Sequence, residues 1–277
     1  PRAVHCARRR GVGVALRKTP PCAAGEVEML AWLETKNALI AAGIPAVNLP
    51  EAPPSGDGQR GIDLYEADLS RADLGGASLS RADLGGAVLS GADLARACLA
   101  GASMIWSRLS RANLIEADLT GADLAWSDMA QVNLRRASLR GADVSRADLT
   151  GADLTGADLT GATMIAADLT RACLRGAHLT GATLTGADLY GVDLREAVIN
   201  WQSRDVIAEI LRRAAGKDQQ RLMLVREVLR SAGEWRWEKF MALDIDPALR
   251  EWALAELRQW VQAGDGAPDT LRGGEGE

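Results

Sequence analysis

The sequence predicts a mainly β protein in which a long coil of short extended segments lies between an N-terminal helix and a C-terminal group of helices. Three observations lead to this fold class. Leu or a similar residue recurs at every fifth position from Leu64 to Ile199, which gives 28 units with no insertion or deletion. Aromatic residues make up only 4% of the chain, so Leu and Ala must build the core. Helical spacing of apolar residues occurs only outside the repeated segment.

The composition of each five-residue unit explains its expected shape. Ala stands two positions before the recurring Leu in most units, Asp most often lies between them, and Ser, Thr, Gly or Arg follow. Residues two apart in an extended segment point to the same side, so Ala and Leu face inward and Asp faces outward. The two following positions carry turn-forming residues. Each unit therefore predicts one side and one corner of a polygonal coil, and the period alone leaves three or four sides open.

The units resemble the pentapeptide-repeat family, whose pattern is A-(D/N)-L-x-x. The stretch "RADLTGADLTGADLTGATMIAADLT", residues 146–170, shows this pattern and one departure from it. The resemblance implies a right-handed quadrilateral β-helix with 20 residues per coil and about seven coils over residues 61–200. Residues 20 apart would then stack, about 4.8 Å from one another.

The ends of such a coil need caps because a solenoid exposes its core there. Residues 26–60 predict a helix over 26–42, followed by the linker "PEAPPSGDGQR". Gly43 and Pro45 would end the helix. Its expected apolar stripe consists of Val27, Leu30, Leu33 and Ile40. Residues 1–25 are expected to be a disordered tail.

Residues 201–263 predict an α-helical domain. Ser203, Asp218 and Asp246 are expected helix N-caps, the last of them before a Pro at the first helical position. Three apolar sets have helical spacing: Val206, Ile207, Ile210 and Leu211; Leu222, Val225, Val228 and Leu229; and Leu249, Trp252, Ala253, Leu257, Trp260 and Val261. Residues 264–277 are expected to be a disordered tail.

Charge and cysteine usage bound the environment of the protein. The net charge is −5, and residues 61–200 contain no Lys, so we expect no direct binding to nucleic acid. No apolar run approaches the roughly 18 residues of a membrane span. The four cysteines have no CxxC spacing, which predicts unpaired thiols in a reducing compartment, the cytoplasm.

No arrangement of residues points to catalysis, to a metal or to a cofactor. His5 and His178 are the two histidines, and His178 has no acidic or Cys pair at ligand spacing. The glycines recur as corner residues and form no phosphate-binding loop. The aspartates recur because the unit repeats, so paired carboxylates follow from geometry. We therefore expect no enzymatic activity and no cofactor.

The departures from the pattern define a candidate partner-binding patch. "GASMIW", at 101–106, and "GATMIA", at 161–166, are separated by three full coils of the implied length, and therefore lie on one face. Trp106 and Trp126 are separated by one coil and should stack. The patch consists of Ile105, Trp106, Trp126 and Ile165. Exposed apolar groups on a polar solenoid favour a contact with a protein partner. The alternatives are that residues 26–42 or the second copy of a homodimer cover the patch, or that its members are tolerated singly.

Two charged stripes are further candidates. The acidic ladder consists of Asp128, Asp148, Asp168 and Asp188, which occupy the same place in consecutive coils. The basic stripe consists of Arg135, Arg136, Arg175 and Arg195. Each is either an ordinary solvated face or a surface that a partner recognises by its charge.

These features predict a non-enzymatic protein-interaction scaffold whose partner the sequence does not name. An alternative is a protein that imitates the charge of duplex DNA and modulates or protects a type II topoisomerase, as the quinolone-resistance branch of the family does. The acidic ladder favours this alternative, whereas the absence of projecting loops and the presence of a C-terminal helical domain depart from that branch. A third possibility is an adaptor whose helical domain binds the target while the solenoid acts as a spacer.

Overall fold

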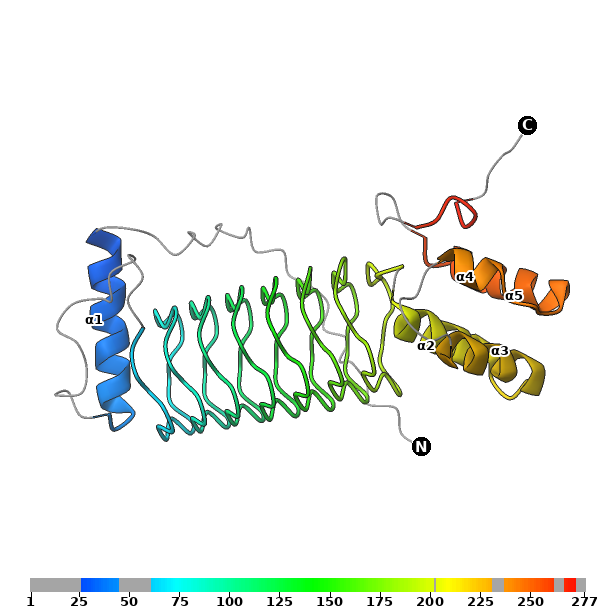
Figure 1. The fold of residues 1–277 in the computed structure, drawn as a ribbon. Coiled ribbons are helices and arrows are strands. Elements are labelled where there is room, and N and C mark those ends of the chain that lie inside the picture. The colour runs from blue at the N-terminus through cyan, green and yellow to red at the C-terminus, as the bar shows by residue number, and fades with distance from the viewer. Residues whose placement is uncertain (1–25, 45–60, 202, 231–236, 262–266, 273–277) are drawn as a thin grey trace, which may run out of the picture.

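The computed structural model describes residues 26–44, 61–201, 203–230, 237–261 and 267–272. The repeated segment forms a row of coils, with helix α1 (Glu26–Ala41) across its first coil and the remaining helices beyond its last coil (Figure 1). The expected tail over residues 1–25 and the expected linker lie outside the described residues.

Parallel β-bridges between residues 20 apart fix the geometry of the coil. The bridges form four columns, and each column runs through seven levels; the first column, for example, runs from Asp63 through Asp83 to Thr183. Four columns make the coil four-sided, so the implied repeat length and the seven coils are confirmed. The bridges are isolated single-residue contacts, and the described part of the solenoid contains no longer strand. The mainly β character therefore consists of bridges and corners, because each side is too short for a continuous ladder.

Hydrogen bonds of the backbone follow the same register. The Leu64 amide donates to the Asp83 carbonyl at 2.7 Å, and the Asp83 amide donates to the Ile62 carbonyl at 2.8 Å. At each corner the amide of the next unit donates back to the recurring Leu, as Ala67 does to Leu64 at 3.0 Å. Each coil thus satisfies the polar backbone groups of the next coil.

The second residue of each corner adopts a left-handed backbone conformation. Gly fills many of these positions, and 14 non-glycine residues also have a positive φ between 54° and 62°. A turn that requires a positive φ at its third position explains this preference for Gly. Non-glycine residues accept a steric cost there, and the repeat imposes it.

The interior of the coil is formed by the expected Leu and Ala positions. Leu84, Leu124 and Leu154 are fully buried, as is Ala87. Ser replaces the inward Ala at two positions, Ser107 and Ser127, and both are buried. The narrow interior accounts for the scarcity of aromatic residues, since Leu and Ala already fill it.

Helix α1 closes the first coil, as expected, but with a different face from the predicted one. Thr35 and Leu39 are buried, whereas Leu33 and Ile40 are 45% and 41% exposed. The Thr35 hydroxyl accepts a hydrogen bond from the Ser78 amide at 2.7 Å. Ser78 lies in the first coil and has no preceding coil to bind, so a polar side chain satisfies its amide. The predicted stripe is therefore wrong at Leu33 and Ile40; the side chains of Val27 and Leu30 lie outside the description.

The C-terminal domain contains helices α2 (Arg204–Ala215), α3 (Gln219–Arg230), α4 (Trp237–Met241) and α5 (Pro247–Arg258). Helices α2, α3 and α5 pack against one another. The three expected N-caps are confirmed: Ser203 accepts from the Val206 amide, Asp246 from the Ala248 amide, and Asp218 from two amides of the first turn of α3.

The packing within this domain follows the predicted apolar sets in most positions. The first set is buried on α2, while Leu222 and Trp252 are half-buried. Phe240 is fully buried, and its ring lies 5.1 Å from that of Trp237.

The expected disorder after residue 264 does not extend to residues 267–272. Ala267 and Leu271 are buried, and the Trp237 indole donates to the Thr270 hydroxyl at 2.6 Å. Apolar side chains within a Gly-rich segment thus add to the helical domain.

Helix α2 contacts the last coil. The Arg212 guanidinium lies 5.4 Å from the centroid of the Tyr190 ring, and it also pairs with the buried Glu209 carboxylate at 2.6 Å. Hydrogen bonding to Glu209 raises the pKa of Arg212, so the group stays charged. The Arg212 guanidinium therefore contacts both the helical domain, at Glu209, and the last coil of the solenoid, at Tyr190.

The cap at the first coil provides a stability test. Thr35→Val keeps the shape of the side chain but leaves the Ser78 amide without its acceptor, which should lower the free energy of unfolding by about 1–3 kcal/mol. Hydrogen exchange at the Ser78 amide should become faster, whereas Thr35→Ser retains the hydroxyl and should change it little. Unchanged exchange at Ser78 in Thr35→Val would show that this contact does not secure the cap.

Candidate protein-binding surface

The two tryptophans of the predicted patch stack in adjacent coils. The ring centroids of Trp106 and Trp126 lie 4.9 Å apart at an interplanar angle of 13°. The Trp106 side chain is 61% exposed and that of Trp126 is 43% exposed. The predicted stack is therefore present, and it stands open to solvent.

The stack occupies corner positions that favour glycine. Trp106 and Trp126 both have a φ of 62°, in the left-handed region. The column at this corner runs through Glu66, Gly86, the two tryptophans, Arg146 and Ala166, one coil after another. A positive φ is sterically unfavourable for a residue with a large side chain. The tryptophans are therefore not explained by the local fold.

The remaining members of the patch lie at the same corner but are separated by Arg146. Ile105 is half-buried beside Trp106, and Ile165 is 42% exposed. The Arg146 amide donates to the Ile165 carbonyl at 2.9 Å. The guanidinium of Arg146 lies 4.5 Å from the centroid of the Trp126 ring. We call Ile105, Trp106, Trp126, Arg146 and Ile165 the tryptophan surface.

Arg146 was missing from the predicted patch, although the sequence contained a signal for it. It follows Trp126 in the same column and lies one coil further along. A cation over the face of Trp is attracted by the ring quadrupole. The residue that stands 20 positions after Trp126 is the next member of the column, and this spacing identifies Arg146.

Helix α1 does not account for the exposed patch. Its buried residues face the first coil, where Thr35 binds Ser78. Trp106 lies one coil beyond Gly86 and two beyond Glu66, and it remains largely exposed. Coverage by residues 26–42, one of the alternatives, is therefore not what the structure shows.

The acidic ladder forms one bridged column. Asp128, Asp148, Asp168 and Asp188 are paired by consecutive parallel bridges, and Arg108 precedes them. Each carboxylate accepts a hydrogen bond from the amide two residues later, for example from Thr150 at 2.9 Å and Thr170 at 2.8 Å. Within the described residues these four carboxylates form no ion pair. The ladder thus shapes the corners and also presents a row of negative charge, whose last member, Asp188, contributes to the raised pKa of Arg212 on helix α2.

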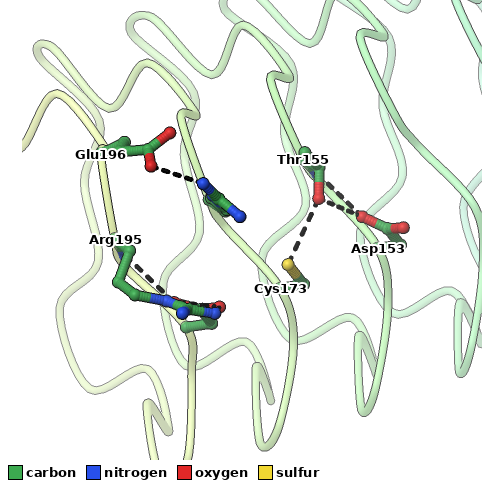
Figure 2. Close-up of polar contacts among 7 residues, drawn as sticks. Asp153, Thr155, Cys173, Arg195 and Glu196 are labelled. Atoms are coloured by element: carbon green, nitrogen blue, oxygen red, sulfur yellow. Dashed lines mark hydrogen bonds and ion pairs between the residues drawn. The ribbon is translucent and has the colours of Figure 1, made fainter. Parts of the chain in front are cut away.

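The basic stripe lies at another corner, where carboxylates neutralise it. Arg135 pairs with Asp153, and Arg136 with Glu116, each at 3.8 Å. Arg175 pairs with Glu196 at 2.6 Å, and Arg195 with Asp193 at 2.9 Å (Figure 2). The stripe is therefore a row of mixed charge, and a partner that sought positive charge would have to compete with these carboxylates.

The cysteines do not follow the expectation of unpaired thiols. Cys98 and Cys173, the two cysteines within the described ranges, are both disulfide-bonded, but not to each other, because they lie in different bridge columns and four coils apart. Their spacing in sequence gave no sign of this, so the two described cysteines do not support the expected cytoplasmic location, which stays a prediction. Among the residues that the structure describes, no helix has both the length and the apolar character needed to cross a bilayer. The same residues contain no cluster of His, Cys, Asp and Glu suited to a metal ion.

A four-sided solenoid with helices at both ends and an uninterrupted five-residue period defines a repeat protein. The sequence pattern described as pentapeptide repeats matches residues 67–104, 97–136, 107–146, 127–165 and 164–200, in 8 copies. The chain belongs to the pentapeptide-repeat family. None of the curated proteins matches this chain.

Three solved structures illustrate the likeness. A pentapeptide repeat protein from the thylakoid lumen of Arabidopsis thaliana is 38% identical, with 35% of this chain and 65% of that chain covered, at a TM-score of 0.31. HetL from Nostoc sp. strain PCC 7120, involved in heterocyst differentiation regulation, is 32% identical, with 52% of this chain and 90% of that chain covered, at a TM-score of 0.16. QnrB1, a plasmid-mediated fluoroquinolone resistance protein, is 24% identical, with 49% of this chain and 76% of that chain covered, at a TM-score of 0.36. The chain thus spans less than two thirds of the Arabidopsis protein.

The ion pairs of the basic stripe predict a pH-dependent stability. The side-chain hydrogen bond from Arg195 holds the pKa of the Asp193 carboxyl below its usual range. A lowered pKa in the folded state stabilises the fold above the ordinary pKa of about 3.9, and this stabilisation is lost as the pH falls through the folded-state value. Asp193→Asn should therefore lower the free energy of unfolding at pH 7, by less than about 1 kcal/mol because the pair is exposed.

Urea unfolding at pH 7 and near pH 3 measures this effect. The difference between Asp193→Asn and the native chain should shrink at the lower pH. Asp73→Asn is a matched control in the same column, because Asp73 forms no ion pair within the described residues. A difference of equal size at both pH values would show that charge is not its cause.

Proposed function

We propose that the protein is a non-enzymatic scaffold that binds a protein partner through the tryptophan surface. The observation that carries this proposal is the exposed stack of Trp106 on Trp126, at positions where the backbone favours Gly. Exposed Trp residues are enriched among the residues that dominate binding energy at protein interfaces. The coil fixes the spacing of the two rings, so little side-chain entropy is lost when a partner binds.

The charges beside the stack support a protein partner over a nucleic acid. The acidic ladder lies on the face next to this corner, and the arginines of the opposite stripe are paired with carboxylates. Phosphates would be repelled by the first feature and find few free cations at the second. A second copy of this chain is an alternative protein partner at the same surface.

Replacement of both tryptophans by Gly tests the proposal. Trp106→Gly/Trp126→Gly removes the rings but installs the residue that the corners favour, so the fold should persist. The full chain and the variant would be compared in affinity capture from a lysate of the source organism, followed by direct binding of each captured protein. At least one captured protein should bind the native chain and lose ten-fold or more in affinity for the variant.

Gln131→Gly is the matched control, because Gln131 has a φ of 57° at a different corner. It should leave binding unchanged. Light scattering on the same proteins tests the homodimer, which should dissociate in the double variant if the rings hold it together. Identical captured proteins, affinities and masses for the native chain and the folded double variant would overturn the proposal.

A second candidate function is modulation or protection of a type II topoisomerase by DNA mimicry. The observation that favours it is the acidic ladder, whose four bridged aspartates form no ion pair within the described residues. Regularly spaced carboxylates imitate the spaced charges of a phosphate backbone in sign, and the coil makes the row rigid. The likeness to QnrB1 concerns the fold.

A supercoiling assay with purified gyrase tests the second candidate. The native chain at micromolar concentration should inhibit supercoiling or protect gyrase from a quinolone if this function holds. Asp148→Asn/Asp168→Asn should weaken the effect several-fold, because Asn can still accept the corner amide while the charge is lost, as Asn113 does. No effect of the native chain at micromolar concentration would remove this candidate.

A further inference from the structure

The two faces of the tryptophan stack differ in what lies over them. Trp126 has Trp106 on one side and the Arg146 guanidinium, 4.5 Å away, in the next coil on the other side. Over the outer face of Trp106, no described residue places an aromatic ring or a cation. The column explains the difference, because the neighbouring coil on that side has Gly86 at the corner.

Gly86 leaves the level next to Trp106 without a side chain of its own, as Gly186 does at the far end of the same column. A Cβ at Gly86 would meet the Glu66 Cγ at 3.1 Å, a tight contact, so the Glu66 side chain leans into this level from one side; on the other side no atom of Trp106 would lie within 4 Å. Adjacent levels of the coil are about 4.8 Å apart. That spacing is close to the 4.9 Å of the tryptophan stack, so one planar group fits over Trp106 at the level of Gly86. We call this space the Gly86 gap.

Carboxylates surround the gap. Glu66 leans over Gly86 from the first coil, and Asp63, Asp68 and Asp83 lie on the two faces that meet at this corner. Within the described part of the chain none of these four carboxylates forms an ion pair. On the acidic face, the column that begins at Asp68 continues through Val88 to Arg108, which is exposed and is the first cation of that column. Arg71 and Arg81 lie at the two neighbouring corners, so the excess of negative charge is local to the corner of Glu66 and Gly86.

Tyr65 closes the gap on the side away from the acidic face. Its ring lies 3.1 Å from where a Cβ on Gly85 would be, and it is 60% exposed. The charge of the adjacent Glu66 carboxylate and its side-chain hydrogen bond with the phenol raise the pKa of Tyr65, so a ligand cation would share this carboxylate with Tyr65. A ligand in the gap would thus meet the faces or edges of two aromatic rings and a carboxylate.

We propose that the Gly86 gap binds an arginine side chain of the protein partner, with its guanidinium stacked on Trp106 and paired with Glu66. This proposal rests on the proposed function and identifies the chemistry of the contact. The molecule contains both halves of the arrangement: Arg146 covers Trp126, and Arg136 pairs with Glu116 one coil away at another corner. A guanidinium is planar, stacks on aromatic rings and binds carboxylates, whereas an ammonium group lacks the planar stacking surface.

Filling the gap from within the chain tests the proposal. Gly86→Arg places a guanidinium one coil from Glu66 and over Trp106, and the positive φ of 65° at this position is one that Arg adopts at Arg96 and Arg146. The control Gly121→Arg adds the same charge at a corner with a φ of 64° where a Cβ meets nothing within 4 Å. Both variants should fold, which circular dichroism checks.

The probe is a blocked hexa-arginine peptide titrated into the full chain by calorimetry, with hexa-lysine and hexa-citrulline as comparison peptides. Hexa-arginine should bind, hexa-lysine several-fold more weakly, and hexa-citrulline not measurably. Gly86→Arg and Trp106→Gly should each weaken hexa-arginine binding by about ten-fold. Gly121→Arg should weaken it less than three-fold.

Other outcomes overturn the assignment. Equal affinity of the native chain and Gly86→Arg, or equal binding of the citrulline peptide, would show that no cation enters the gap. A ten-fold loss in Asp148→Asn/Asp168→Asn with none in Gly86→Arg would assign the peptide to the acidic ladder. If a partner is lost by Trp106→Gly/Trp126→Gly but retained in full by Gly86→Arg, the tryptophan surface stands and the arginine contact falls.

Discussion

The parallel hydrogen bonds between consecutive coils are the constraint on which the rest of the structure depends. Each recurring Leu donates its amide one coil onward, as Leu64 does to Asp83, so every residue has a fixed neighbour in the next coil. An insertion in any unit would shift all later columns and break these pairs. The core, the corners and the exposed columns therefore follow from one register, and a surface group acquires its neighbours from the coils before and after it.

The backbone conformation at the corners limits which residues can occupy the exposed columns. The second residue of each corner must adopt a positive φ, and Arg and Glu accept that cost at ten positions, whereas Trp accepts it at two. A strained position alone is therefore no mark of function here. What distinguishes Trp106 and Trp126 is that their large apolar surface stays exposed, whereas several charged residues at other corners, such as Arg96 and Glu116, form ion pairs across the coils. The tryptophan surface stands out by its unsatisfied apolar area.

The sequence predicted what the period determines and failed where contacts depend on a single side chain. Its period, with the family resemblance, gave the 20-residue coil, the tryptophan stack and the bridged acidic column. The buried face of α1 could not be predicted, because the first coil offers it a backbone amide, which Thr35 satisfies, as well as an apolar surface. The neutral character of the basic stripe was also missed, since the partners Asp153 and Glu196 stand in different columns from the arginines that they bind.

The distribution of charge along the acidic face bears on what this solenoid binds. A mimic of duplex DNA needs an unbroken row of negative charge, but the column from Asp68 to Asp188 is interrupted by Val88 and Arg108 in the coils next to the tryptophan stack. The interruption divides the carboxylates into a group around Gly86 and a row from Asp128 onward. Two separate acidic regions with aromatic rings between them suit a partner that presents discrete cations and an apolar segment, which is a property of a polypeptide.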